Sequence, residues 1–214
     1  MSAQPGAEGA AAVRGLMSEH GWVRIAYDTS TWILCPPGFP PGHDLQSWSA
    51  GYARLWWDAS GIPHADHDVT RLTRSLASVH QGIYGQVACH LAFVHLPANP
   101  RVGPLPLCLG VWPMYGEREA QLRLLAHADD PKATKPPVVE QACTPRLGTG
   151  LRVLRYLRQE SGPEVIGCLE YAWRSEEHQT DLRVFAATGD LGRLQMAMPA
   201  IDEFTHGITV VPRG

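Results

Sequence analysis

Four runs near the carboxyl end of the sequence decide the fold: VVEQACTP (138–145), GLRVLRYLRQE (150–160), EVIGCLEYAWR (164–174) and DLRVFAAT (181–188). They contain many β-branched and aromatic residues, which favour strands. The segments between them are LGTG, SGP and SEEHQT, which have the composition of turns. Four extended runs joined by short turns predict an antiparallel meander.

The second of these runs is also compatible with a helix, because its leucines recur at helical spacing and Ser161-Gly162-Pro163 could end a helix. The third run has a similar length and looks like a hairpin partner, which favours a strand. One row of that strand would then face the core at most positions: Leu151, Val153, Arg155 and Leu157. The helical alternative would make Gly148-Thr149-Gly150 a candidate phosphate-binding loop, whereas the strand makes it part of a hairpin.

The amino-terminal third begins with small residues, and we expect a flexible arm over residues 1–11 and a short helix over 11–20. WVRIAY (22–27) and TWILC (31–35) are predicted to pair as a hairpin. The proline-rich segment 36–42 cannot enter a central strand, so it is expected to cross the sheet edge.

After the proline-rich segment, apolar residues recur at helical spacing. This spacing predicts one helix from Asp44 to Gly61 and another from Asp66 or Asp68 to Gln81, which Gly82 and Gly85 would end. The apolar runs 87–96 and 104–112 are expected to be covered strands, followed by a helix over 117–128. A last helix should run from Asp190 or Gly192 to about Phe204, interrupted by Pro199, before the final ITVV.

This order of elements predicts an α+β fold, a mainly antiparallel β-sheet with helices packed on it. A chain of 214 residues can bury one large core, so we expect a single domain over residues 12–214. No internal repeat or low-complexity tract argues for a second domain.

Composition limits the classes of partner. The net charge of −3 and the pI near 6.3 provide no basic field for nucleic acid or for an anionic membrane. Only two of the 18 basic residues are lysines, Lys132 and Lys135, which is typical of a high-GC bacterial genome. The five cysteines are odd in number and lie mostly in apolar runs. With no recognisable export signal, they predict buried free thiols and a cytoplasmic location.

The most ligand-like cluster is His64-Ala65-Asp66-His67-Asp68, in which His64, His67 and Asp68 could meet a divalent metal. The competing interpretation is a polar loop that caps the next helix with an aspartate. Nothing in the sequence nominates a further ligand from elsewhere, and we predict no metal and no other cofactor.

Cys89, His90 and His95 lie in a predicted strand, where a thiol and an imidazole could act as nucleophile and base. Adjacent residues of a strand point to opposite faces, so Cys89 and His90 cannot pair directly. A hydrogen-bonded core histidine is therefore the favoured interpretation. None of the known nucleophile, phosphate-binding or metalloprotease motifs is present.

The most unusual feature is the aromatic content, with seven tryptophans in the chain. In the helix after Asp44, one face should bury Leu45, Trp48, Tyr52, Leu55, Trp56 and Ala59. Trp57 lies about 100° from that face, so it must pack under another element or meet a partner. We predict a binding surface made of Trp57, Trp56, Tyr52 and Phe39.

The layout of WVRIAY and TWILCPPG, a central helical stretch, then GLRVLRY, CLEYAWR and DLRVFAAT with a short closing helix, resembles the Mog1/PsbP-like α/β/α sandwich proteins of actinobacteria. That resemblance implies a binding or accessory module without catalysis. We therefore predict a non-catalytic module of a bacterial cytoplasmic system that engages a protein or small apolar ligand. The alternative is a metal- or histidine-dependent enzyme with an unrecognised site.

Overall fold

The computed structural model describes residues 10–18, 21–86, 89–159 and 164–211. Within these ranges the elements are β1 (Ala10–Ser18), β2 (Gly21–Asp28), β3 (Trp32–Cys35), α1 (Leu45–Ser60), α2 (Asp66–Gln86), β4 (Leu91–His95), a 3-10 turn (Pro100–Val102), β5 (Leu105–Pro113), α3 (Arg118–Leu125), β6 (Val138–Thr144), β7 (Gly148–Arg158), β8 (Val165–Ser175), β9 (Thr180–Thr188), α4 (Leu191–His206) and β10 (Ile208–Val211). Residues 1–9 of the predicted arm lie outside the described ranges.

Seven strands form one sheet in the order β3-β4-β5-β9-β8-β7-β6, and each neighbouring pair is antiparallel. The meander predicted for residues 138–188 is confirmed, because β6, β7, β8 and β9 are adjacent in the order of the chain. The run that could have been a helix is strand β7, in which Leu154 lies opposite Leu169 of β8. The α+β class with a mainly antiparallel sheet is confirmed.

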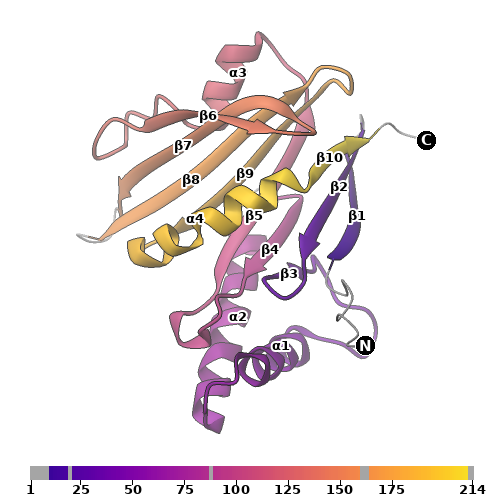
Figure 1. Cartoon of the computed structure of the whole chain (residues 1–214), viewed down its shortest axis with the longest axis vertical. Coiled ribbons are helices and arrows are strands. Elements are labelled where there is room, and N and C mark those ends of the chain that lie inside the picture. Colours follow the sequence, from indigo (N-terminus) through magenta and orange to yellow (C-terminus); the bar gives the residue numbers. More distant parts are fainter. Residues whose placement is uncertain (1–9, 19–20, 87–88, 160–163, 212–214) are drawn as a thin grey trace, which may run out of the picture.

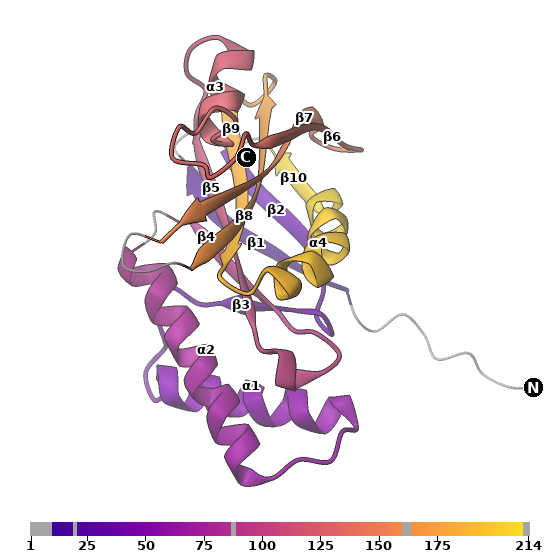
Figure 2. The same ribbon diagram turned by 90° about the vertical axis from the view of Figure 1, so that its left-hand side faces the viewer.

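The two faces of the large sheet are covered differently (Figures 1 and 2). One face packs against α4 and against a small sheet of order β1-β2-β10. The other face packs against α1 and α2 near β3, β4 and β5, and against α3 near β7 and β8. Strand alternation explains how one strand serves both layers: Leu107 and Leu109 of β5 face the α4 side, and Cys108 faces α2.

Helix α1 begins and ends where the sequence predicts. The Asp44 carboxylate accepts the backbone N–H of Ser47 at 2.7 Å, and the Ser47 hydroxyl oxygen accepts the backbone N–H of Asp44 at 3.0 Å. This reciprocal capping satisfies two groups that a helix start leaves unpaired. The helix stops at Gly61, whose φ of +63° is a left-handed conformation that glycine adopts without strain.

Helix α2 is longer than predicted, since it continues through Gly82 and Gly85 to Gln86. Glycine inside a helix costs about 1 kcal/mol relative to alanine. The apolar stripe of the helix continues past Gly82, because Ile83 is buried with Leu76 against the sheet. Burying such a side chain contributes about 1.5–3 kcal/mol, which exceeds the cost of the glycine.

Helix α4 is continuous, so the predicted interruption at Pro199 is wrong. A proline removes one helical hydrogen bond and typically costs about 3 kcal/mol in a helix interior. Leu194 and Ala197 before the proline, and Ile201 and Phe204 after it, are all buried in the same core. Packing on both sides of Pro199 therefore outweighs the local penalty.

Two predictions near the amino terminus are wrong. Residues 11–18, predicted as helical, belong to strand β1, which pairs with β2 so that Val13 lies opposite Ile25. The predicted hairpin of residues 22–27 with 31–35 does not form, because β2 joins the small sheet and β3 pairs with β4 of the large sheet. In the first case a local hairpin, and in the second a long-range pairing of Trp32–Cys35 with residues 92–95, outweighs the predicted preference.

Candidate ligand-binding site

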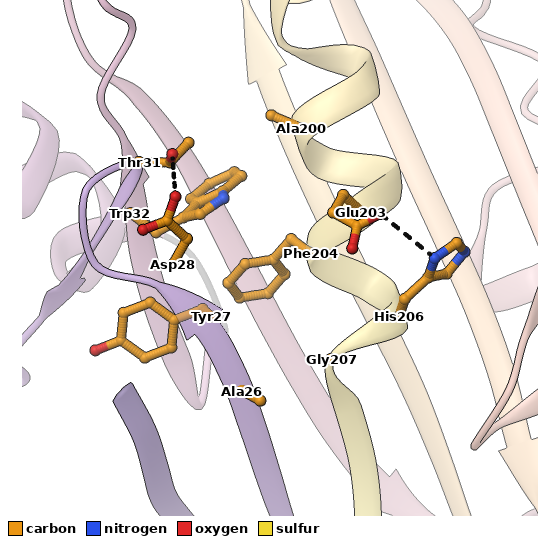
Figure 3. Close-up of a pocket in the computed structure, with 10 residues that line it drawn as sticks. All are labelled: Ala26, Tyr27, Asp28, Thr31, Trp32, Ala200, Glu203, Phe204, His206 and Gly207. Atoms are coloured by element: carbon orange, nitrogen blue, oxygen red, sulfur yellow. Dashed lines mark hydrogen bonds and ion pairs between the residues drawn. The ribbon is translucent and has the colours of Figure 1, made fainter. Parts of the chain in front are cut away.

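A pocket of about 680 Å³ opens between the turn that joins β2 to β3 and the carboxyl-terminal half of α4 (Figure 3). Its size lies within the range of about 300–1,000 Å³ that is typical of small-molecule sites. The residues that line it are Ala26, Tyr27, Asp28, Thr31, Trp32, Ala200, Glu203, Phe204, His206 and Gly207. We refer to this pocket as the groove.

Three aromatic side chains form the apolar part of the groove. Trp32 and Phe204 have ring centroids 4.8 Å apart and are each only 3% exposed, so they form its floor. Tyr27 is half-buried, and its ring lies 6.4 Å from that of Phe204. Burial, and secondarily the nearby Tyr52 hydroxyl, raises the pKa of Tyr27, which is therefore a neutral phenol at physiological pH.

The wall formed by β2 is fixed to the end of α4 by close backbone contact. The N–H of Ala26 donates to the carbonyl of Gly207 at 3.0 Å. A Cβ atom at position 207 would lie 1.9 Å from the carbonyl oxygen of Ala26, so only glycine allows this approach. Gly207 also follows the last residue of α4 and precedes β10, which pairs with β2. The two walls are thus held together by the main chain.

The rim of the groove carries carboxylates. Asp28 accepts hydrogen bonds from the Ser30 N–H at 2.8 Å, the Ser30 hydroxyl at 2.7 Å and the Thr31 hydroxyl at 2.9 Å. These bonds, with the Ser30 hydroxyl contributing most, lower the pKa of Asp28. On the opposite wall, Glu203 lies 3.7 Å from the His206 imidazole. The groove therefore combines an aromatic floor with negatively charged edges.

The structure places Trp57 differently from the predicted surface. Trp57 is fully buried, and its ring stacks on that of His64 with a centroid distance of 5.2 Å. The buried face of α1 consists of Ser49, Ala53, Trp56 and Trp57, whereas Leu55 is 65% exposed. The predicted face was rotated by about one residue, because the sheet and α2 cover the side that carries Trp57. Trp57 thus belongs to the core and has no surface to offer a partner.

The other three residues of the predicted surface have mixed environments. Trp56 is also buried, and its indole N–H donates to the carbonyl of Pro97 at 2.8 Å. Phe39 is half-buried, with its ring 5.3 Å from the His80 ring, and Tyr52 is half-buried and close to Tyr27. A partner-binding role for Phe39 and Tyr52 stays a prediction.

The candidate metal ligands have local roles. His64 stacks on Trp57 and lies 3.8 Å from Asp58, while Asp68 accepts the N–H of Ala65 at 3.2 Å. His67 is exposed and lies 3.6 Å from Asp68. Among the residues that the structure describes, no three His, Cys, Asp or Glu side chains are grouped as metal ligands. Asp68 makes the backbone contact expected of the capping interpretation.

Cys89, His90 and His95 are each engaged separately. The Cys89 thiol donates to the Leu91 carbonyl at 2.7 Å, and His90 Nδ1 accepts the Val111 N–H at 3.1 Å. His95 is buried, and its Nδ1 lies 2.6 Å from the Arg193 guanidinium. Burial, followed by the positive charge of Arg193, lowers the pKa of His95 to about 4. His95 is thus a neutral, hydrogen-bonded core histidine.

The Gly148-Thr149-Gly150 loop lies at the β6–β7 hairpin. Gly148 has a φ of +70°, and Thr144 lies opposite it in the register of the two strands. No helix follows the loop, so it lacks the helix start that a phosphate-binding loop requires. The hairpin interpretation is confirmed.

Sequence reasoning missed a buried charged cluster on the sheet face that carries α3. Glu170 is 1% exposed and accepts hydrogen bonds from Arg155 at 2.6 and 3.1 Å. It also lies 3.1 Å from Arg183 and 2.8 Å from His127 Nδ1. Burial opposes ionisation of Glu170, but these partners outweigh it and keep its pKa below the usual value. The sequence feature that could have indicated this cluster is Arg155, a charged residue in the row predicted to face the core.

His127 enters this cluster from a strained backbone. Its φ is +50°, in the left-handed region that residues other than glycine seldom adopt. It follows the carboxyl end of α3 and lines a second pocket of about 510 Å³ with Arg123 and Asp130. The hydrogen bond to Glu170 fixes the orientation of the imidazole ring.

The fold and the groove define a layered α+β protein with a preformed apolar pocket. No protein-family model matches the chain, and no curated protein matches it. The solved structures that match include "Crystal structure of LpqN involved in cell envelope biogenesis of Mycobacterium tuberculosis". That match has 10% sequence identity and a TM-score of 0.47, and it covers 89% of this chain and 83% of the other.

Similarity at that level transfers neither a family nor a function to this chain. It also does not single out the Mog1/PsbP-like group, so membership of that group stays a prediction. None of the described helices combines the length and apolar character that a bilayer span requires.

Proposed function

We propose that the protein is a non-catalytic binding module whose groove takes up the apolar part of a small ligand. The observation that carries this proposal is the aromatic floor of Trp32 and Phe204 beneath an open pocket of about 680 Å³. Apolar pockets with a few polar groups at the edge are typical of ligand sites. The half-buried Tyr27 ring and the other exposed apolar surface of the groove would lose contact with water on binding, which favours association.

The groove is also preorganised. The floor residues Trp32 and Phe204 are packed in the main core, and the Ala26–Gly207 contact fixes the spacing of the walls. A site that is already formed needs little ordering when a ligand binds, so more of the contact energy contributes to affinity.

We further propose that the module operates in a bacterial cytoplasm. All five cysteines lie in the described ranges and all are free, including the exposed Cys143. Unpaired thiols persist most readily in a reducing compartment. Fractionation of the native host with an antibody to this protein would check the location, and recovery in the cell envelope would contradict it.

The binding proposal can be tested with N-phenyl-1-naphthylamine, a neutral dye whose fluorescence rises in apolar surroundings. The dye should bind the wild-type protein, and Ala200→Trp should abolish the signal because the new indole fills the groove. Leu55→Trp is the matched control, since it adds the same side chain on an exposed part of α1. Equal binding to the wild type and Ala200→Trp, with both proteins folded, would contradict the proposal.

The rival function is a histidine-dependent enzyme, and the observation that favours it is His127. A strained residue whose Nδ1 is held by the buried Glu170, beside a pocket, has the geometry of an oriented general base. A panel of ester and phosphoester substrates should distinguish the two functions. Turnover lost in His127→Gln but kept in His206→Gln would favour the enzyme.

A metal-dependent enzyme that uses His64, His67 and Asp68 is the other form of this rival. Elemental analysis of protein purified without added metal tests it directly. Stoichiometric zinc, iron or manganese that is lost in a His64→Ala/His67→Ala variant would favour it over the binding module.

A further inference from the structure

The charges at the groove restrict the chemistry of its ligand, and this inference rests on the proposed binding function. Of the ten described residues that line the groove, Asp28 and Glu203 are acidic, and none is lysine or arginine. Asp28 comes from the β2 wall and Glu203 from the α4 wall, with the Phe204 ring between them in Figure 3. A ligand on the aromatic floor would therefore lie between two carboxylates.

The negative charge of Asp28 is held in place but not neutralised. Its hydrogen-bond donors are the N–H and hydroxyl of Ser30 and the hydroxyl of Thr31, which are all uncharged. They fix the carboxylate and favour its ionised form, and within the described part of the chain no cation is among the causes of the lowered pKa. The charge of Asp28 remains available to a ligand.

Glu203 is free to adjust. Its side chain is 84% exposed, and its ion-pair partner is His206, at 3.7 Å. That separation is too long for a hydrogen bond, and an exposed pair of this kind contributes little. Among the lining residues that the structure describes, His206 is the single titratable base. Moving the Glu203 carboxylate toward a bound cation would therefore lose only a weak interaction with His206.

We propose that the groove selects small organic cations, in which an apolar body rests on the aromatic floor and an ammonium group lies between Asp28 and Glu203. Two effects support the cation over a neutral molecule of the same shape. The carboxylates attract it, and the faces of aromatic rings such as Tyr27 attract cations through the quadrupole of the ring. An anion of the same shape would be repelled by both carboxylates.

The test compares phenyltrimethylammonium with tert-butylbenzene, its neutral carbon isostere. Titrations followed by two-dimensional NMR of the labelled full-length chain report both the affinity and the residues that shift. The cation should bind roughly tenfold more tightly than the isostere, as expected for a cation–π contact with added carboxylate attraction. Residues of the groove should show the largest shifts, and high salt should weaken binding of the cation only.

Charge-removing variants locate the origin of the preference. Glu203→Gln should weaken binding of the cation about threefold without changing the isostere, as expected for one exposed carboxylate. Glu177→Gln is the matched control, because that carboxylate is 86% exposed and also lies near a histidine, His178, at 4.0 Å. Asp28→Asn should add to the effect of Glu203→Gln, and because Asp28 also orders its turn, Glu203→Gln alone is decisive.

The outcomes separate the two proposals. If the isostere binds in the groove as tightly as the cation, cation selection is wrong and the binding module stands. If Glu203→Gln leaves the preference unchanged, the assigned carboxylates are wrong. If neither compound binds in a way that Ala200→Trp abolishes, both the inference and the proposed function fail.

Discussion

The aromatic residues of this protein gather in two regions that contrast in sequence and in exposure. In the first region, Trp48, Tyr52, Trp56 and Trp57 follow one another along a single helix, α1. In the second, Tyr27, Trp32 and Phe204 come from three elements, β2, β3 and α4. The cluster that is conspicuous in the sequence is centred on a fully buried Trp57, whereas the dispersed one lines an open pocket.

The difference has a physical cause. Helix α1 carries aromatic side chains on adjacent faces, and Trp56 and Trp57 are buried between α2 and the sheet while Trp48 and Tyr52 are half-buried. A pocket needs walls that diverge, which one helix cannot supply. Elements from distant parts of the chain can do this, because their separation is set by the fold and not by the helical repeat.

The largest expected effect is on the first region. Trp57→Ala should lower the free energy of unfolding by about 3–5 kcal/mol, because it leaves a cavity in a closed core. Urea denaturation measures the loss, and groove binding by the remaining folded protein should be unchanged. A stability change below about 1 kcal/mol, or a selective loss of ligand binding, would contradict the assignment of Trp57 to the core.

Glu170 offers a comparison on the same sheet face as α1. Glu170→Gln should cost about 3 kcal/mol, because the buried Arg155 and the half-buried Arg183 would lose their shared carboxylate. Glu177→Gln, at an exposed site, should change stability by less than about 0.5 kcal/mol. Equal values for the two variants in chemical denaturation would show that the buried cluster contributes nothing net.

His95, which packs beside the groove residue Trp32, makes the stability of the protein sensitive to acid. Its ring lies 4.8 Å from that of Trp32, and its folded-state pKa of about 4 lies below the ordinary value of 6.5. The stability that the neutral His95 ring contributes is therefore fully present above pH 6.5. It is lost as the pH falls toward 4, because the unfolded chain binds a proton at this position at a higher pH than the folded chain does. The loss should reach roughly 2 kcal/mol by pH 4.5.

A pH series of denaturation curves checks this prediction. The wild type should lose stability between pH 6.5 and 4.5 more steeply than His95→Gln, which has no imidazole to protonate. His67→Gln, altered at an exposed histidine, should follow the wild type. Parallel curves for the wild type and His95→Gln would refute the assignment.

The smallest expected effect is on the wall of the groove. Tyr27→Leu should weaken binding of the neutral dye by about 1 kcal/mol, roughly fivefold, because it removes one half-buried aromatic surface. Stability should change by about 1 kcal/mol or less, in contrast to Trp57→Ala. A large loss of stability with unchanged dye affinity would place Tyr27 with the core residues and not with the site.

The sequence predicted most of the fold because the relevant signals are local. Residues 138–188 alternate with strand periodicity between short turns, and Asp44 with Gly61 marks the limits of α1. The errors arise where tertiary packing and strand pairing decide the outcome against the local residue preference. β1 is a strand because β2 pairs with it, and Pro199 is tolerated because Ile201 and Phe204 pack beyond it.

The candidate site was less accessible to prediction. Phe204 and Trp32 are ordinary apolar residues in their own segments, and only the fold brings them together. The requirement for glycine at 207 becomes visible only when Ala26 is seen to approach it. Periodicity also could not place the α1 face to within one residue, which is the difference between a surface Trp57 and a core Trp57.

The contact between Ala26 and Gly207 sets an order of events during synthesis. The β2 wall leaves the ribosome before α1 and α2, whereas the α4 wall and β10 emerge after the other described elements. The site therefore cannot assemble on a nascent chain that lacks residue 207, however completely α1 and α2 have folded. Until then β2 has an unpaired edge, which β10 later covers. Ligand capture should thus report the synthesis of α4 and β10 more sharply than helix content does.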